Sequence, residues 1–146
     1  IKIVDQYMKC DLVEISLNFN RVNFLKYFKE CKMLNVEKLL IQKSHILNFN
    51  LLDLNNNFLS LTEIDLGSCK QQVFHFFNYS YNKFLEKSFS LKKISLSDLS
   101  LCSDILKNKF DFSIFDELDY IDLSFNKIEI LDSGIFEYNT KLKYLD

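Results

Sequence analysis

Residues 118–131, with the sequence LDYIDLSFNKIEIL, decide the fold of this 146-residue chain. Their apolar residues follow a fixed spacing, and the phrase that opens at Leu118 starts again at Leu142. Self-similarity with a period of roughly 20 to 50 residues is typical of a solenoid, in which each repeat forms one coil. The chain is therefore predicted to wind into a stack of similar coils.

Earlier copies of this phrase can be placed in the same register. The copies start near positions 12, 36, 61, 91, 118 and 142, and the interval from 61 to 91 is the longest. The pattern L-x-x-L-x-L-x-x-N-x-L at intervals of roughly 20 to 29 residues is that of the leucine-rich repeat. Residues 1–146 are predicted to form one leucine-rich repeat domain. Since the chain starts at Ile1 and stops inside the sixth copy, we expect it to be a fragment of a longer protein.

Each copy contains a short alternation of apolar and polar residues, as in Ile94-Ser95-Leu96. Such alternation predicts a half-buried strand. Because one coil cannot bury its apolar face alone, neighbouring coils must share an interior. The predicted fold class is an α/β-type solenoid. It is a right-handed leucine-rich repeat coil with a parallel sheet on the concave face and loops or short helical turns on the convex face.

The asparagine position of the repeat predicts a structural ladder. The chain leaves the strand there, and a buried amide can satisfy backbone groups that the sheet no longer pairs. The ladder is interrupted where its residue cannot form a hydrogen bond, so we expect a local distortion or water at the leucine. The five ladder positions are Asn20, Ser44, Cys69, Leu99 and Asn126.

Aromatic residues are predicted to fill the convex wall, where Phe136 represents the fifth copy. The chain has 15 phenylalanines, which favours an aromatic row between coils, although a compositional bias of an AT-rich genome also raises this number. The candidates in other coils are Phe28, Phe84 or Phe89, and Phe110, Phe112 or Phe115.

The composition argues against several functions. A net charge of −2 argues against a nucleic-acid partner, which favours a basic face. The chain has two glycines and no proline, and therefore no glycine-rich phosphate loop. Its two histidines, His45 and His75, form no catalytic or metal-binding arrangement in the sequence. We expect no enzymatic activity, no catalytic residue, no metal and no cofactor.

The four cysteines leave the redox compartment open. Cys69 occupies a ladder position, which favours a buried and unreactive thiol over a disulfide. Cys10 and Cys31 could pair only if adjacent coils bring them close together. The spacing of Cys102 from the others matches no known metal or disulfide motif.

The C-terminal stretch 118–146, LDYIDLSFNKIEILDSGIFEYNTKLKYLD, resembles the extracellular leucine-rich repeats of Toll-like receptors. The match includes Asp122, Ser124, Asn126, Gly134 and Phe136. The resemblance implies a receptor ectodomain on the extracellular side of the cell membrane, attached to it only through a segment outside this chain. It also implies a protein or microbial ligand and possible receptor dimerisation. The alternatives are a cytoplasmic scaffold or regulatory protein, and a repeat array attached to a catalytic domain elsewhere.

Ligand-binding residues are predicted at the outward positions of the strands. There, acidic and basic residues alternate from copy to copy, which predicts modest attraction between neighbouring strands. A solvated face without a ligand is the alternative interpretation. The candidates on this face are Glu14, Lys38, Glu63, Asp65, Lys93, Tyr120 and Asp122.

A second candidate contact lies in the longest repeat, near residues 70–85. Phe74, Phe76 and Phe77 could form a protruding hydrophobic patch, or they could simply pack. Asn78 opens the sequon Asn78-Tyr79-Ser80, which predicts a glycan if the protein is secreted.

Overall fold

The computed structural model describes residues 14–18, 21–23, 35–47, 58–69 and 90–146. Several sequence predictions concern residues outside these ranges, and the structure does not test them. They are the ladder position Asn20, the cysteines Cys10 and Cys31, His75, the convex-wall candidates Phe28, Phe84 and Phe89, the patch candidates Phe74, Phe76 and Phe77, and the sequon residue Asn78.

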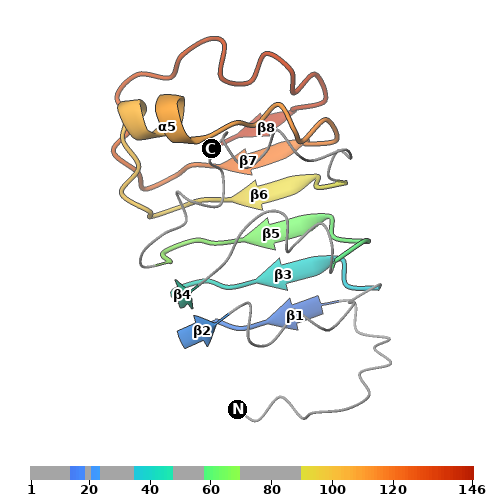
Figure 1. The fold of residues 1–146 in the computed structure, drawn as a ribbon. Helices are drawn as coiled ribbons and strands as arrows, with labels where there is room; N and C mark the ends of the chain where they lie inside the picture. Colours follow the sequence, from blue (N-terminus) through green and yellow to red (C-terminus); the bar gives the residue numbers. More distant parts are fainter. Residues whose placement is uncertain (1–13, 19–20, 24–34, 48–57, 70–89) are drawn as a thin grey trace, which may run out of the picture.

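One parallel sheet runs through the described chain, and each of its strands comes from a different copy of the repeat. Figure 1 shows these strands as successive rungs. A chain that returns to the same wall in the same direction must complete one coil in between. In spatial order the strands are β1 (Glu14–Ser16), β3 (Lys38–Leu40), β5 (Glu63–Asp65), β6 (Lys93–Ser95), β7 (Tyr120–Asp122) and β8 (Tyr144–Leu145).

The strand register follows the repeat without a slip. Residues two places after each predicted start are partners: Glu14 with Lys38, Lys38 with Glu63, Glu63 with Lys93, Lys93 with Tyr120, and Tyr120 with Tyr144. Directly after the strands, backbone hydrogen bonds still join each coil to the next. The Leu17 N–H donates to the Leu40 carbonyl oxygen at 2.8 Å, and the Leu96 N–H donates to that of Asp122 at 2.8 Å. The predicted α/β-type leucine-rich repeat solenoid is therefore confirmed.

The interior contains the inward-facing residues of the repeat. The central residues of four strands, Leu39, Ile64, Ile94 and Ile121, are completely buried. Burying one such side chain stabilises a fold by about 1.5 to 3 kcal/mol, and this gain arises only when two coils stack. The same interior extends to further apolar residues of the repeat: Val36, Ile41, Leu66, Leu91, Leu96, Leu101 and Leu118.

A second, two-stranded parallel sheet was not predicted. It pairs β2 (Arg21–Asn23) with β4 (His45–Leu47), and it starts immediately after the ladder positions. In Figure 1 both strands lie to the left of the main sheet, past the carboxyl ends of its strands. His45 is the first residue of β4.

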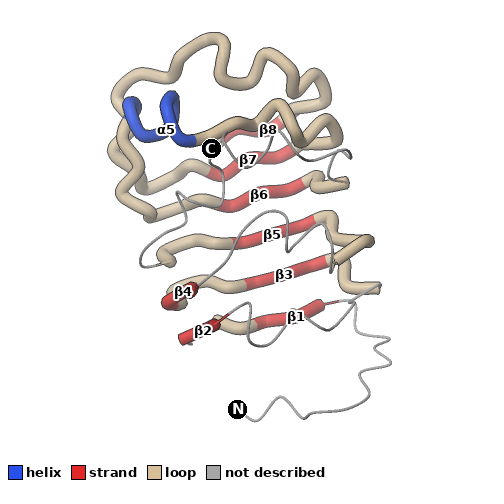
Figure 2. The backbone as a smooth tube through the Cα atoms, viewed as in Figure 1, coloured by secondary structure: helices blue, strands red, loops and turns tan. Residues whose placement is uncertain are grey.

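The opposite wall consists of loops and of one short helix in the described chain, α5 (Ser103–Lys109), as Figure 2 shows. Asp104 in its first turn and Lys107 and Lys109 in its last turn favour this helix through the helix dipole. Leu106 packs this helix against the interior, and its side chain is only 1% exposed.

Aromatic rings fill the space between the last coils, as the sequence predicted. The ring centroids of Phe112 and Phe136 are 5.0 Å apart, and those of Phe110 and Phe112 are 5.8 Å apart. Phe110, Phe112 and Phe115 are all buried, so the convex wall uses all three rather than one of them. Phe58, which was not among the candidates, is also buried.

Candidate functional site

The outward-facing side of the main sheet is the candidate site, and we call it the sheet face. Each coil contributes the first and third residues of its strand and the residue two places further on. Since the central strand residue points inward, its neighbours must point outward. The described members are Glu14, Ser16, Asn18, Lys38, Leu40, Gln42, Glu63, Asp65, Gly67, Lys93, Ser95, Ser97, Tyr120, Asp122, Ser124, Tyr144 and Asp146.

The predicted alternation of acid and base forms fewer ion pairs than expected. Lys38 and Glu63 lie side by side, and their charged groups are 3.6 Å apart. Glu14 forms no ion pair with Lys38, and Glu63 forms none with Lys93, although all four are described and in register. Exposed side chains of this kind gain little by pairing, because water screens the attraction. The predicted chain of attractions across four strands is therefore reduced to one pair.

The aspartates of the sheet face are held by neutral donors. Asp65 accepts hydrogen bonds from the Gln42 amide and from the Gly67 N–H, the latter at 2.9 Å. Asp122 accepts from the N–H and the hydroxyl of Ser124, at 2.9 and 2.6 Å, and from the Ser95 hydroxyl at 3.1 Å. These bonds fix the carboxylates in place but leave their negative charge uncompensated.

Asp122 remains ionised despite its partial burial. Burial opposes its negative charge, but hydrogen bonds from Ser124 and from the hydroxyls of Ser95 and Ser97 outweigh this effect and lower the pKa of Asp122. The carboxylate is thus charged at neutral pH.

Tyr120 connects the last two rungs. Its hydroxyl donates to the Asp146 carboxylate at 2.8 Å, and its ring centroid lies 6.4 Å from that of Tyr144. The hydrogen bond to Asp146, together with burial and the charges of Asp146, Asp122 and Asp65, raises the pKa of Tyr120 to about 12. Three carboxylates from different rungs therefore act on one phenol, which stays neutral and can donate.

Two aromatic side chains, one of this pair and one at the edge of the sheet face, are open to solvent. Tyr144 is 64% exposed, and Phe125 is 86% exposed. Neither was among the predicted site residues. Tyr144 and Asp146 occupy the same repeat positions as Tyr120 and Asp122. Assigning the outward positions in the sixth copy as well would therefore have found them. Phe125 stands directly before the ladder residue Asn126, at a position that the repeat pattern leaves variable, so the repeat frame would have placed it outside the interior.

The far edge of the sheet face has an unusual backbone. The residue before each described ladder position has a positive φ: 53° at Lys43, 55° at Ser68, 52° at Asp98 and 56° at Phe125. This left-handed conformation is uncommon for a bulky residue. These four residues line a shallow hollow at the edge together with Gln42, Gly67 and Ser97. Regular strain at one repeat position therefore turns the chain away from the sheet.

A glycine allows two rungs to approach at this edge. A Cβ atom at Gly67 would lie 2.8 Å from the Ser97 hydroxyl oxygen and 3.1 Å from an Asp65 carboxylate oxygen. A side chain at position 67 would therefore have to displace the Ser97 hydroxyl and press on the Asp65 carboxylate.

The ladder beneath the face connects consecutive coils through its side chains. The Ser44 hydroxyl donates to the Leu17 carbonyl oxygen at 2.8 Å, and the Cys69 thiol donates to that of Ile41 at 2.7 Å. Both acceptors belong to the preceding coil and to the same repeat position. Burial raises the pKa of the Cys69 thiol to about 11, against a smaller lowering by a Ser44 backbone hydrogen bond.

Leu99 occupies its ladder position without a side-chain hydrogen bond, and the next coil compensates. The Asn126 amide oxygen accepts from the N–H groups of Leu99 and Leu101, both at 3.0 Å. A distortion is present as well, because Ser100, directly after Leu99, also has a positive φ, whereas the described residues after Ser44 and Asn126 do not. The buried leucine thus contributes apolar contact where the other positions contribute a donor.

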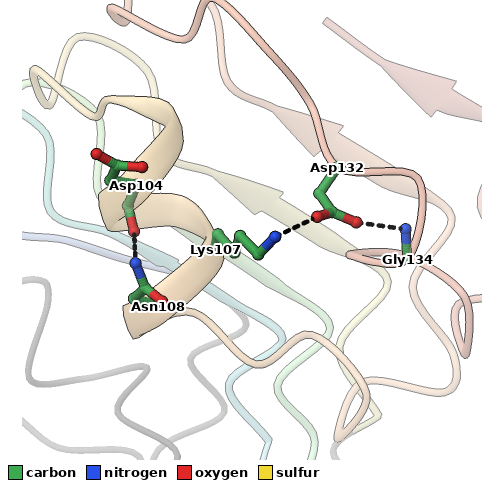
Figure 3. A network of polar contacts seen from close by, with 5 residues as sticks. All are labelled: Asp104, Lys107, Asn108, Asp132 and Gly134. Carbon is green, nitrogen blue, oxygen red and sulfur yellow. Dashed lines mark hydrogen bonds and ion pairs between the residues drawn. The ribbon is translucent and has the colours of Figure 1, made fainter.

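The opposite wall carries a polar network of a different kind. Lys107 of α5 reaches across to the next coil and bonds to Asp132 at 2.7 Å, while the Gly134 N–H donates to the same carboxylate at 3.0 Å (Figure 3). The pair lowers the pKa of Asp132, mainly through the hydrogen bond from Lys107. Both side chains are largely exposed, so this network aligns two coils and forms no enclosed site.

Within the ranges that the structure describes, no three histidine, cysteine or acidic side chains come together to hold a metal ion. In the same ranges, no helix has the length and apolar character needed to cross a bilayer. Cys69 and Cys102, the two described cysteines, are free thiols.

The fold is that of leucine-rich repeat proteins. No family model matches the chain, and no curated protein sequence matches it. Among solved structures, the chain is similar to the crystal structure of an internalin C2 from Listeria monocytogenes str. 4b F2365, with 18% sequence identity and a TM-score of 0.61. The match covers 92% of this chain and 50% of the internalin chain, so this chain spans about half the length of that protein. At such identity the likeness concerns the fold alone.

Proposed function

We propose that this chain is a non-enzymatic recognition module that binds another protein through its sheet face. One observation carries the proposal: a regular sheet presents exposed aromatic side chains, Tyr144 and, at the edge, Phe125, beside ordered polar residues. Aromatic groups within a polar rim are typical of protein-binding surfaces. Because the rungs fix the backbone that carries these groups, less conformational freedom is lost on binding, which favours affinity.

Photo-crosslinking tests this role. A photoreactive phenylalanine analogue placed at Lys93 lies on the sheet face, and the same analogue at Lys109 lies at the end of α5 on the opposite wall. Both lysines are exposed, so neither change disturbs the interior. After irradiation in an extract of the cells that express the chain, a discrete adduct should form from position 93 only. Adducts from position 109 alone, or equal adducts from both, would place recognition elsewhere.

We also propose, from the sequence resemblance of residues 118–146, that the module belongs to a Toll-like or related receptor ectodomain and binds a protein or microbial ligand. The cytoplasmic scaffold is the alternative. Mass spectrometry of the natively expressed protein separates the two. A glycan on Asn78 supports the extracellular proposal, whereas an unmodified Asn78 in a chain made without a signal peptide contradicts it.

A further inference from the structure

The sheet face is uneven in charge and in aromatic content. From β5 to β8, its outward residues include the carboxylates of Glu63, Asp65, Asp122 and Asp146, against the single ammonium group of Lys93. Glu63 already has a cationic neighbour in Lys38. The three aspartates accept hydrogen bonds from amides, hydroxyls and backbone N–H groups, which do not neutralise them.

Aromatic rings lie next to these charges. Tyr120 and Tyr144 form a tilted pair on the last two rungs, and the hydroxyl of Tyr120 is fixed by Asp146. The face of an aromatic ring attracts a cation, most strongly when a carboxylate is close enough to bond to the same group. An arginine side chain can satisfy both demands, because its planar guanidinium stacks on rings and bonds to carboxylates.

We propose that Asp65, Tyr120, Asp122, Tyr144 and Asp146, which we call the tyrosine–aspartate surface, bind a segment of a partner protein that is rich in arginine and lysine. This inference rests on the proposed function and specifies the partner for the same face. The aspartates supply negative charge from three rungs, and the tyrosine rings supply the stacking surface. Charge complementarity of this kind steers association and selects against acidic partners.

An unbiased peptide library tests the class of partner. Random short peptides displayed on phage are selected against the immobilised chain, and enriched sequences are tested as free peptides. We expect enrichment of arginine and lysine, with binding that weakens as salt rises, because salt screens exposed charges. Enrichment of acidic or purely apolar peptides would overturn the inference, as would the absence of any enrichment.

Matched charge variants locate the binding surface. The double change D122N and D146N removes two charges from the tyrosine–aspartate surface, whereas D104N and D116N remove two from exposed positions off the sheet face. The first should weaken peptide binding about tenfold or more, and the second less than about twofold. Equal losses in both variants would overturn the inference.

A second variant serves if the double change impairs folding. Tyr144→Ala removes a ring that is 64% exposed, and Tyr138→Ala removes one that is 66% exposed on the opposite wall, so both should fold. Only Tyr144→Ala should weaken binding of the selected peptides. If both variants bind equally well, the surface does not recognise these peptides. Should basic selectivity fail while crosslinking from position 93 persists, the recognition role survives and only the partner class is wrong.

Discussion

Asn126 reaches back by one coil and donates from Nδ2 to the carbonyl oxygen of Leu96 at 2.9 Å. The same nitrogen also donates to the Leu123 carbonyl oxygen at 2.7 Å within its own coil. Its amide oxygen serves the N–H groups of Leu99 and Leu101. A single side chain thus satisfies backbone groups of two coils at the point where each leaves the sheet.

Replacing Asn126 by alanine should therefore destabilise the fold by about 3 kcal/mol, because partly buried backbone donors and acceptors lose their partner. Urea unfolding followed by circular dichroism measures this loss. The matched control is Asn108→Ala on the exposed side of α5, which should change the unfolding free energy by less than about 1 kcal/mol. Similar losses in the two variants would show that the ladder does not hold the coils together.

Two phenylalanines should respond very differently to truncation. Phe112 is 1% exposed and packs between Phe110 and Phe136, so Phe112→Ala should cost about 3 to 5 kcal/mol through a core cavity. Phe125 is 86% exposed at a positive φ, so Phe125→Ala should change stability by about 0.5 kcal/mol or less. Thermal or urea unfolding of both variants checks this contrast, and a large loss for Phe125→Ala would contradict its outward placement.

The rungs of this fold could be predicted from the sequence, since period-two alternation and the repeat interval together determine which residues face inward. The β2–β4 sheet could not be predicted, because the repeat pattern does not require a strand there: the matching positions of the copies starting at 91 and 118 form only an isolated bridge between Cys102 and Lys127. Phe58 was missed for a related reason: the convex wall has no fixed spacing, so the depth of each aromatic residue depends on the packing of neighbouring coils.

The sequence predicted which residues of each strand face outward at the candidate site, but not which of them contact one another. Glu14, Lys38, Glu63 and Lys93 were expected to pair along the sheet, yet only one ion pair forms among them. The sequence cannot show how long exposed side chains divide their contacts between water and each other. It also gave no sign that Asp146 would bond to Tyr120, because that contact depends on the height of the phenol above the sheet.

The ladder thiol predicts a pH dependence. Burial raises the pKa of Cys69 to about 11 from its ordinary value of 9.0, so the folded chain holds this proton more tightly than the unfolded chain. Between these two values the unfolded state binds fewer protons, and stability must fall as pH rises. Its contribution is fully present below pH 9 and should decline by about 2 kcal/mol toward pH 11.

Cys69→Ser is the control for this dependence, because a serine hydroxyl can still donate to the Ile41 carbonyl oxygen but does not titrate in this range. Urea unfolding at a series of pH values from 8 to about 10.5 compares the two chains. The decline should be steeper in the wild type than in the variant. Parallel curves would show that the Cys69 thiol is not buried as described.

The stacked coils and the sheet face both depend on the placement of equivalent repeat residues on consecutive rungs of one sheet. Lys38 and Tyr144 are such residues, separated by four strand intervals along β3, β5, β6, β7 and β8. At about 4.8 Å per interval their backbones lie roughly 19 Å apart. Spin labels at these two positions, in a chain whose native cysteines are changed to serine, should give a narrow distance distribution centred at about 20 Å by double electron–electron resonance. A broad distribution, or a maximum beyond about 35 Å, would contradict the stacked coils and the sheet face built on them.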